Sequence, residues 1–464
     1  MQRQFPLLVV LFLAGCAAGP DYAPPAVDAG DGWSQPAADE SPADLSTWWT
    51  TFDDPTLDRL IEQARRENPD LREAVARVAQ ARALRDAVAG GRYPTLAADA
   101  SVTRRRQSEN GPLPIRQIPG IERDQTIFET GFDAAWEIDV FGSTRRAVEA
   151  ASARVGEAEA QSDAARLTVT AEVARVYLTL RGLQRERAVR ESALRLARDT
   201  AAVVRRQFEL GEVAEAQAVQ ADAEAASLEA ELPLYDAEIR SQALALSALL
   251  GQLPESELAL LRETTDYPTL DALPVGERAD LLRRRPDVRA AERRLAAATA
   301  EIGVATAELF PHLTIGAAGS FQALEASDLF ESGSETFSLV PLISWRVFAG
   351  GSIRARIRAR EAGARAAAIA YEGAVLTALS DAERALSRYH YDLLALERQR
   401  VAVTAARRSH ELAQLRHDAG EISLLELMDA ERSLRNAETA YARLHRGAET
   451  DLVALFKALG GGWE

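Results

Sequence analysis

Residues that build disulfides and metal sites are scarce in this 464-residue chain. Cys16 is the only cysteine, so the chain has neither an internal disulfide nor a cysteine-based zinc or iron–sulfur site. Two methionines do not support a methionine-lined metal pathway. Among the five histidines, His410 and His417 share a helix spacing that a solvated face explains better than a metal pair. Because catalytic motifs are missing too, we expect no enzyme, no metal and no cofactor.

The chain also lacks long apolar runs and has fewer basic than acidic residues. The net charge of −16 disfavours a nucleic-acid partner, because phosphates call for a basic surface. No stretch of about 18 apolar residues occurs, so we expect no transmembrane helix. Proline is nearly absent from 143–232 while alanine is abundant, which favours long, closely packed helices.

The single cysteine follows a short apolar stretch at the start of the chain. Residues 1–15 carry one positive charge, an apolar run and small residues, which is typical of a secretory signal peptide. The letters LAGC resemble the lipobox of bacterial lipoproteins, which predicts a covalent lipid on Cys16. The alternative is an ordinary signal peptide with an incidental cysteine. By the same resemblance Ala17 permits transport to the outer membrane, and we expect residues 16–47 to form an extended tether.

An internal duplication organises the rest of the chain. Prolines of the segment 68–96 recur 217 positions later, and glycines and a tryptophan farther along recur at an offset of 209. Chance similarity between alanine-rich helices does not explain constant offsets. We therefore expect two repeats, 48–284 and 285–464, with one shared order of helix, strands and helical hairpin. The matched pairs are Pro69/Pro286, Pro94/Pro311, Trp136/Trp345, Gly211/Gly420 and Gly251/Gly460.

The long segments have the period of helices. Aliphatic residues recur at alternating steps of three and four, the heptad-like spacing of coiled-coil packing. This pattern predicts a helix over 286–309 and antiparallel helical hairpins over 143–250 and 352–460, with a linker over 251–284. A first run of such positions is Val169, Val173, Val176, Leu180 and Leu183.

Four segments alternate between apolar and polar residues instead. They cover about 94–105, 126–140, 311–322 and 335–347. Such runs are typical of transmembrane β-strands, although a soluble, half-buried sheet alternates in the same way. Four strands do not close a membrane barrel, and an open sheet edge is not tolerated in lipid. The pattern therefore predicts an oligomer, and a trimer would supply twelve strands.

Taken together, these features resemble the TolC-like outer-membrane efflux proteins, in the lipoprotein branch that serves resistance–nodulation–division pumps. The resemblance implies a mainly helical homotrimer with a twelve-stranded barrel in the outer membrane and a helical tunnel that extends into the periplasm. It also implies a mixed α/β equatorial region formed by 48–66, 252–284 and the C-terminus. The partners would be outer-membrane lipid, a periplasmic adaptor and an inner-membrane pump. The segments that carry the resemblance are LAGCAAGPDYAPP, WWTTFDDPTLDRLI (48–61), RPDVRAAERRLAAA (285–298), FPHLTI (310–315) and the paired LGEV and AGEI turns.

The two hairpin turns are the first candidate site. By resemblance to the family, residues 210–213 and 419–422 contact the periplasmic adaptor. The simpler interpretation is that the glycines only turn the chain, and both interpretations can hold together. The candidate contact residues are Leu210, Gly211, Glu212, Val213, Ala419, Gly420, Glu421 and Ile422.

Acidic residues beside the second turn are the second candidate site. Threefold symmetry would turn an inward-facing carboxylate into a ring that attracts cations. The resemblance makes Asp429 the first choice for the pore constriction, with Leu425 as an apolar constriction. Asp418 and Glu426 are further gate candidates. The alternative is a solvated outer face or an ion pair between helices.

Three other functions remain open at this point. A periplasmic adaptor of the same pumps also has a long helical hairpin and often a lipidated cysteine, but two hairpins and two strand pairs argue against it. The duct could instead serve type I protein secretion or metal export, since the partner pump chooses the substrate.

Overall fold

The computed structural model describes residues 17–26, 29–30, 32–34, 45–108, 122–262, 266–272 and 275–463. The predicted signal peptide and Cys16 lie outside these residues. The chain divides into two compact units. The first contains the described residues up to Pro25 with Ala79–Glu157 and Glu292–Ala370, and the second contains Ala26–Val78, Ala158–Ala291 and Tyr371–Glu464.

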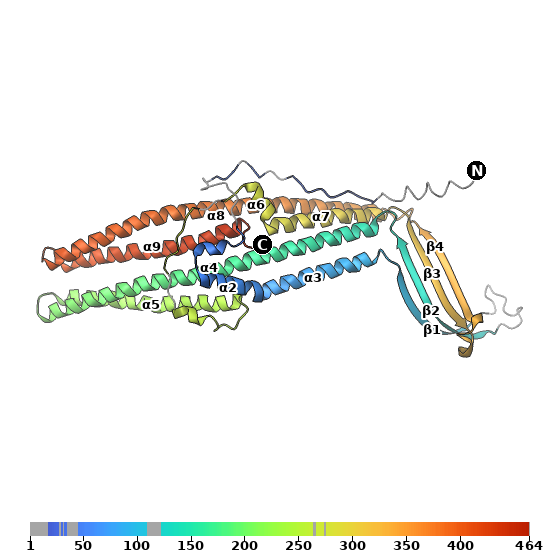
Figure 1. Cartoon of the computed structure of the whole chain (residues 1–464), viewed down its shortest axis with the longest axis horizontal. Helices are drawn as coiled ribbons and strands as arrows, with labels where there is room; N and C mark the ends of the chain where they lie inside the picture. Colours follow the sequence, from blue (N-terminus) through green and yellow to red (C-terminus); the bar gives the residue numbers. More distant parts are fainter. Residues whose placement is uncertain are drawn as a thin grey trace. The chain divides into compact units, whose positions relative to one another are not determined.

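The first unit holds a four-stranded antiparallel sheet. Its strands are β1 (Thr95–Arg106), β2 (Asp124–Ile138), β3 (His312–Ala323) and β4 (Glu335–Ser344), and they pair in that order. Figure 1 shows the four strands side by side. The sheet joins one strand pair from each repeat through the β2–β3 ladder.

The register sorts the side chains of all four strands onto the same two faces. Val102 pairs with Phe128, Trp136 with Ile315 and Leu313 with Ile343, so most large apolar side chains of the four strands fall on one face, with Ile127, Val340 and Leu342 on the other. The other face carries the polar and acidic positions, including Asp99, Glu129, Asp133 and Glu137. Apolar side chains of the first face nevertheless stay exposed in the single chain, with Phe337 at 92%.

Two strands end earlier than the alternation in the sequence suggests. β2 stops at Ile138 and β4 at Ser344, whereas the alternation continues to 140 and 347. In both places an i to i+2 hydrogen bond turns the chain: Val140 N–H donates to the Ile138 carbonyl and Val347 N–H to the Trp345 carbonyl. A tight turn of this kind takes the backbone out of the ladder before the side-chain pattern ends.

The duplicated tryptophans hold duplicated positions. The Trp136 indole N–H donates to the Arg92 carbonyl, and the Trp345 indole N–H donates to the Leu309 carbonyl, both at 3.0 Å. In each repeat the indole therefore ties a residue in or directly after a strand to the short segment that follows the preceding helix.

The helices account for most of the structure. The hairpins are α4 (Ser143–Glu209) with α5 (Glu215–Leu249) and α8 (Ser352–Asp418) with α9 (Leu424–Ala458), and each turns tightly in Figure 1. The shorter elements are η1 (Trp48–Phe52), α2 (Pro55–Glu67), α3 (Pro69–Gly90), η3 (Leu258–Arg262), α6 (Arg278–Arg284) and α7 (Pro286–Ala307). In the described part of the chain, no helix combines the length and the apolar character needed to cross a membrane.

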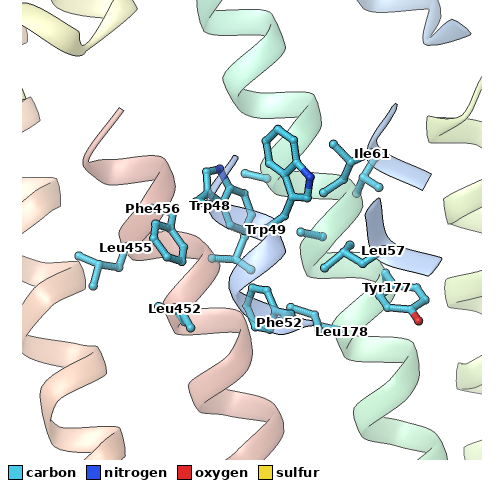
Figure 2. Close-up of a cluster of buried hydrophobic side chains, with 14 of the residues drawn as sticks. Trp48, Trp49, Phe52, Leu57, Ile61, Tyr177, Leu178, Leu452, Leu455 and Phe456 are labelled. Carbon is cyan, nitrogen blue, oxygen red and sulfur yellow. The ribbon is translucent and has the colours of Figure 1, made fainter. Parts of the chain in front are cut away.

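The second unit contains an aromatic core. We define this core by Trp48, Trp49, Phe52 and Phe456 and the aliphatic residues around them. Trp48 stacks on Phe456 with ring centroids 4.9 Å apart, and both tryptophans are 2% exposed. Figure 2 shows this packing of η1 and α2 against α4 and the end of α9. Leu260, Val275 and Leu281 of the segment 252–284 belong to the same buried cluster. Three stretches that are distant in the sequence thus share one core.

The compact units do not coincide with the two repeats. Each unit takes a piece of the first repeat and a piece of the second. In the aromatic core and near the hairpin tips, apolar residues of one repeat are buried together with residues of the other, whereas elsewhere the α4 seam packs against α5 of the same repeat. The duplication is therefore a property of the sequence, whereas the compact units arise from packing between the repeats.

Candidate functional site: the hairpin tips

The first tip ends α4 with a Schellman motif. Gly211 N–H donates to the Phe208 carbonyl at 2.9 Å, and Glu212 N–H donates to the Gln207 carbonyl at 2.9 Å. Gly211 has φ +77, a left-handed conformation that glycine adopts without a Cβ penalty. No heavy atom lies within 4 Å of where its Cβ would be, so backbone conformation rather than space requires the glycine.

The second tip repeats this geometry. Gly420 N–H donates to the His417 carbonyl and Glu421 N–H to the Arg416 carbonyl, both at 2.8 Å, and Gly420 has φ +74. The paired Gly-Glu sequences therefore encode one backbone device twice.

Side chains tie the second tip more firmly than the first. Ser423 Oγ caps α9 by accepting from Glu426 N–H at 3.3 Å, and Arg416 lies 3.4 Å from the Glu421 carboxylate. At the first tip the equivalent position is Ala214, which has no side chain to act as a cap. There, Gln217 Oε1 accepts from the Ala214 N–H instead.

A small apolar cluster packs the two hairpins together near their tips. This tip cluster consists of six buried residues, with Val213 and Met428 partly buried beside it. Among the candidate contact residues, Leu210 is 62% exposed, and Glu212, Ala419 and Glu421 are also exposed. The tip cluster comprises Ala201, Val204, Ala218, Ala221, Leu424 and Leu427.

Two of the four gate candidates lie together. Leu425 and Asp429 line a groove between α9 and the first hairpin. Asp429 forms an ion pair with Arg432 one turn later, and Leu425 is 52% exposed. An ion pair within α9, and not the ion pair between helices that the sequence left open, therefore engages Asp429.

The other two gate candidates are engaged elsewhere. Asp418 accepts from the Gln414 side chain at 2.9 Å, and Glu426 belongs to the Ser423 cap. Neither residue lines the groove with Asp429.

Sequence reasoning missed three residues in the same groove. Arg435 of α9 forms an ion pair with Glu224 of α5, which links the two hairpins directly. Beside this pair, Glu431 is only 7% exposed, and burial raises the pKa of its carboxyl while Arg435 opposes that shift. The one local signal was the spacing of Glu431 and Arg435 at i and i+4, which places both on one helix face. Their partner on α5 is about two hundred residues away and leaves no local trace.

A second missed feature is a buried clamp between α4 and α9, which we define by Arg185, Glu186, His445, Arg446 and Glu449. Arg185 Nη2 donates to both carboxylate oxygens of Glu449 at 2.6 Å, and Glu449 is fully buried. His445 Nδ1 lies 2.8 Å from the same carboxylate. Arg446 donates to Glu186 at 2.7 Å. Neighbouring residues of α4 therefore hold α9 through the buried Arg185–Glu449 pair and the Arg446–Glu186 pair, in which the Arg446 side chain is 32% exposed.

A carboxyl pair joins α8 to α9 within the second hairpin. Burial, together with a hydrogen bond to Asp451, raises the pKa of Asp392 to about 7. Arg388 lies 3.0 Å from Asp451 and 3.5 Å from Asp392. Asp392 is therefore poised to gain or lose a proton near neutral pH.

Within the described residues, no group of three or more His, Cys, Asp or Glu side chains could hold a metal ion.

Comparison with known proteins identifies the class. The family model described as "Outer membrane efflux protein" matches residues 60–252 and 278–461. The chain is 32% identical to the pyoverdine export outer membrane protein OpmQ of Pseudomonas putida, over 95% of this chain and 93% of that protein. It is 30% identical to the toluene efflux pump outer membrane protein TtgI of Pseudomonas putida, over 99% and 98% respectively. A solved structure of the outer-membrane channel OprN matches with a TM-score of 0.87 and 37% identity, covering 97% of this chain and all of that chain.

The chain belongs to the outer membrane efflux protein family. It is an outer-membrane exit duct of an efflux system, as the sequence resemblance predicted. The family consists of outer-membrane channels rather than enzymes. With this assignment, the hairpin tips are the candidate working end of a channel and not a catalytic centre.

Proposed function

We propose that the duct is a homotrimer whose twelve strands close a barrel in the outer membrane, with the helical hairpins forming a periplasmic tunnel. The main support for this proposal comes from the sheet. One of its faces is largely apolar on all four strands, and β1 and β4 each have one edge without a partner among the described residues. Lipid does not tolerate open edges, so these edges call for other copies of the chain.

The two faces of the sheet fix its orientation in this proposal. The apolar face, with Val102, Phe132 and Phe337, would contact lipid. The face with Asp99, Asp133 and Glu137 would line a water-filled lumen. Carboxylates on the lumen side favour cations over anions along the exit path.

The hairpin tips would receive substrate from the rest of the pump. We propose that the exposed residues at 210–213 and 419–422 contact a periplasmic adaptor, which couples the duct to an inner-membrane pump. Asp429 and Leu425 would narrow the pore, and the Asp429–Arg432 ion pair holds this carboxylate at the groove. Opening would separate α9 from the first hairpin, whose link there is the small tip cluster and the Arg435–Glu224 pair.

The cargo would be small molecules that the partner pump selects. The two curated relatives described above are named for pyoverdine export and toluene efflux, although both are outer-membrane components of one family. Such variety fits a passive duct. Type I protein secretion and metal export stay as alternatives within the same fold. The adaptor alternative has lost its support, because the chain matches a channel family along most of its length.

The oligomeric mass and the conductance test this proposal together. We expect protein extracted from outer membranes in detergent to have the mass of a trimer and to open cation-preferring pores in planar bilayers. A monomer released without detergent, or a trimer that forms no pores, would overturn the barrel. Labelled palmitate should enter the wild-type protein but not Cys16→Ser, and equal labelling of both would refute the lipid anchor.

A further inference from the structure

The segment that follows Cys16 lies in a close-fitting seat. Ala18 N–H donates to the Phe141 carbonyl at 2.9 Å, in the turn between β2 and α4. Arg146 of α4 then donates to the Ala18 carbonyl at 3.1 Å and to Asp21 at 2.6 Å. The Arg146 side chain is only 5% exposed, so its charge is committed to these contacts and to Glu149.

The same segment also reaches α7. Tyr22 donates its hydroxyl hydrogen bond to Glu292 of α7. Gly19, with φ +85, lies directly on the backbone of Gly303, also in α7. The segment therefore contacts a helix of the first repeat and a helix of the second, all within the first unit.

Glycines make the close approach possible from both sides. A Cβ on Gly19 would lie 2.5 Å from Gly303 Cα. A Cβ on Gly303 would lie 2.7 Å from the Ala18 carbonyl oxygen and 2.7 Å from Arg146 Cγ. A Cβ on Gly142 would lie 2.8 Å from Ala17 Cα. The N-terminal segment can therefore lie against α7 and the start of α4 only because all three positions lack a side chain.

We propose that residues 17–22 are a docked strap that fastens α4 to α7 and fixes where the N-terminal anchor leaves the duct. An extended linker would bind no particular surface, whereas this strap has backbone bonds, a buried arginine and a glycine-lined seat. The seat opens beside the β2–α4 turn, at the end of the sheet nearest the helices. An anchor held at this point pulls on both repeats together. The strap itself does not depend on the trimer or on the cargo; its role in anchoring rests on the proposed lipidation.

Hydrogen exchange of the detergent-extracted full-length protein tests the strap. The exchange is measured by mass spectrometry on peptides that cover 17–26. We expect exchange at the Ala18 amide to be slowed roughly tenfold or more relative to an unstructured segment. Gly19→Ala and Gly303→Ala should each return this exchange to the unstructured rate. Fast exchange in the wild type, or protection that survives Gly303→Ala, would overturn the proposal.

Matched glycines supply the controls. Gly303 and Gly363 are both helical, but a Cβ on Gly363 meets nothing within 4 Å, so Gly363→Ala should leave the strap protected. Alanine favours a helix more than glycine does, so a loss of docking in Gly303→Ala cannot be assigned to a weakened α7. Gly32 has φ +101 and no neighbours, and Gly32→Ala controls for strain in the same N-terminal stretch.

The unlipidated protein separates this proposal from the lipid anchor. If the seat holds the strap, Cys16→Ser should keep the slow exchange at Ala18 even though no palmitate is attached. Fast exchange in Cys16→Ser alone would show that the membrane anchor, and not the seat, holds the segment, and this would overturn the strap. Palmitate labelling of Gly303→Ala should stay at the wild-type level, because the seat acts after lipidation.

Discussion

The buried clamp and the hairpin tips join the same two hairpins by opposite means. At the clamp, the side chains of Arg185 and Glu449 are almost completely removed from water. At the tips, the link is a cluster of six mostly small residues together with the Arg435–Glu224 pair, in which the Glu224 side chain is 35% exposed. Exposed ion pairs are worth little, whereas a buried pair is costly to break. The junction at the clamp should therefore cost more to break than the junction at the tips, which is what the proposed opening at the tips requires.

Breaking the clamp should give the largest effect. Arg185→Ala leaves the Glu449 carboxylate fully buried with only His445 beside it, and we expect the free energy of unfolding to fall by about 3–5 kcal/mol. Chemical unfolding of the detergent-extracted protein measures this. Arg198→Ala is the control, since its pair with Glu229 is exposed on both sides and should contribute at most about 1 kcal/mol. Equal losses in both variants would remove the contrast between the two regions.

The Asp392 pair should make the second hairpin sensitive to pH. Because the folded state raises the pKa of Asp392 from 3.8 to about 7, folding takes up a proton in this range. Its contribution to stability is full below pH 3.8 and is lost as the pH rises through about 7. The loss amounts to at most about 4 kcal/mol, a figure that already includes the opposing effect of Arg388.

Thermal unfolding between pH 5 and pH 9 measures this contribution. Asp392→Asn keeps the shape and removes the titration, so its melting temperature should vary less with pH than that of the wild type. Identical pH profiles would show that Asp392 titrates normally.

Altering the turn of the second tip should abolish export without unfolding the protein or preventing formation of the oligomer. Proline at position 420 cannot adopt φ +74, so Gly420→Pro must rearrange the tip at a local cost of about 1–3 kcal/mol. We expect the oligomer to form and drug tolerance to fall to the level of a strain without the duct. Gly420→Asn should keep export, because asparagine tolerates the left-handed conformation. Unchanged tolerance in the proline variant would count against the tip as a working surface.

Releasing the gate candidate should give the smallest energetic effect. Asp429→Ala removes the carboxylate proposed to narrow the pore; its exposed pair with Arg432 lies within α9 and is worth up to about 1 kcal/mol, so stability should change little while single-channel conductance rises. Antibiotic leak should rise with it. Asp418→Ala is the matched control, because Asp418 is also exposed but lies outside the groove. If Asp418→Ala opens the channel and Asp429→Ala does not, the constriction lies nearer the turn.

Local features of the sequence predicted much of the fold. The alternation of Phe128, Phe132 and Trp136 gave the faces of β2 correctly, and the Gly-Glu pairs at 211 and 420 gave both turns. Strand ends were less accurate, because the i to i+2 hydrogen bonds after Ile138 and Ser344 interrupt the ladder without changing the side-chain pattern. Of the gate candidates, the structure brings together Asp429 and Leu425 in one groove. Their role in gating stays a prediction.

The sequence by itself determined the two repeats, the heptad seams, the sides of the sheet and the position of each turn. These follow from the chemistry of neighbouring residues and from offsets along one chain. Only the tertiary structure decided that Arg185 meets Glu449, that Arg435 meets Glu224 and that Gly19 rests on Gly303. Each of these contacts joins residues more than two hundred positions apart, and their energy comes from burial that no local pattern records. The seams show that the helices must pack, but the partner of each buried charge depends on how the two repeats fit together.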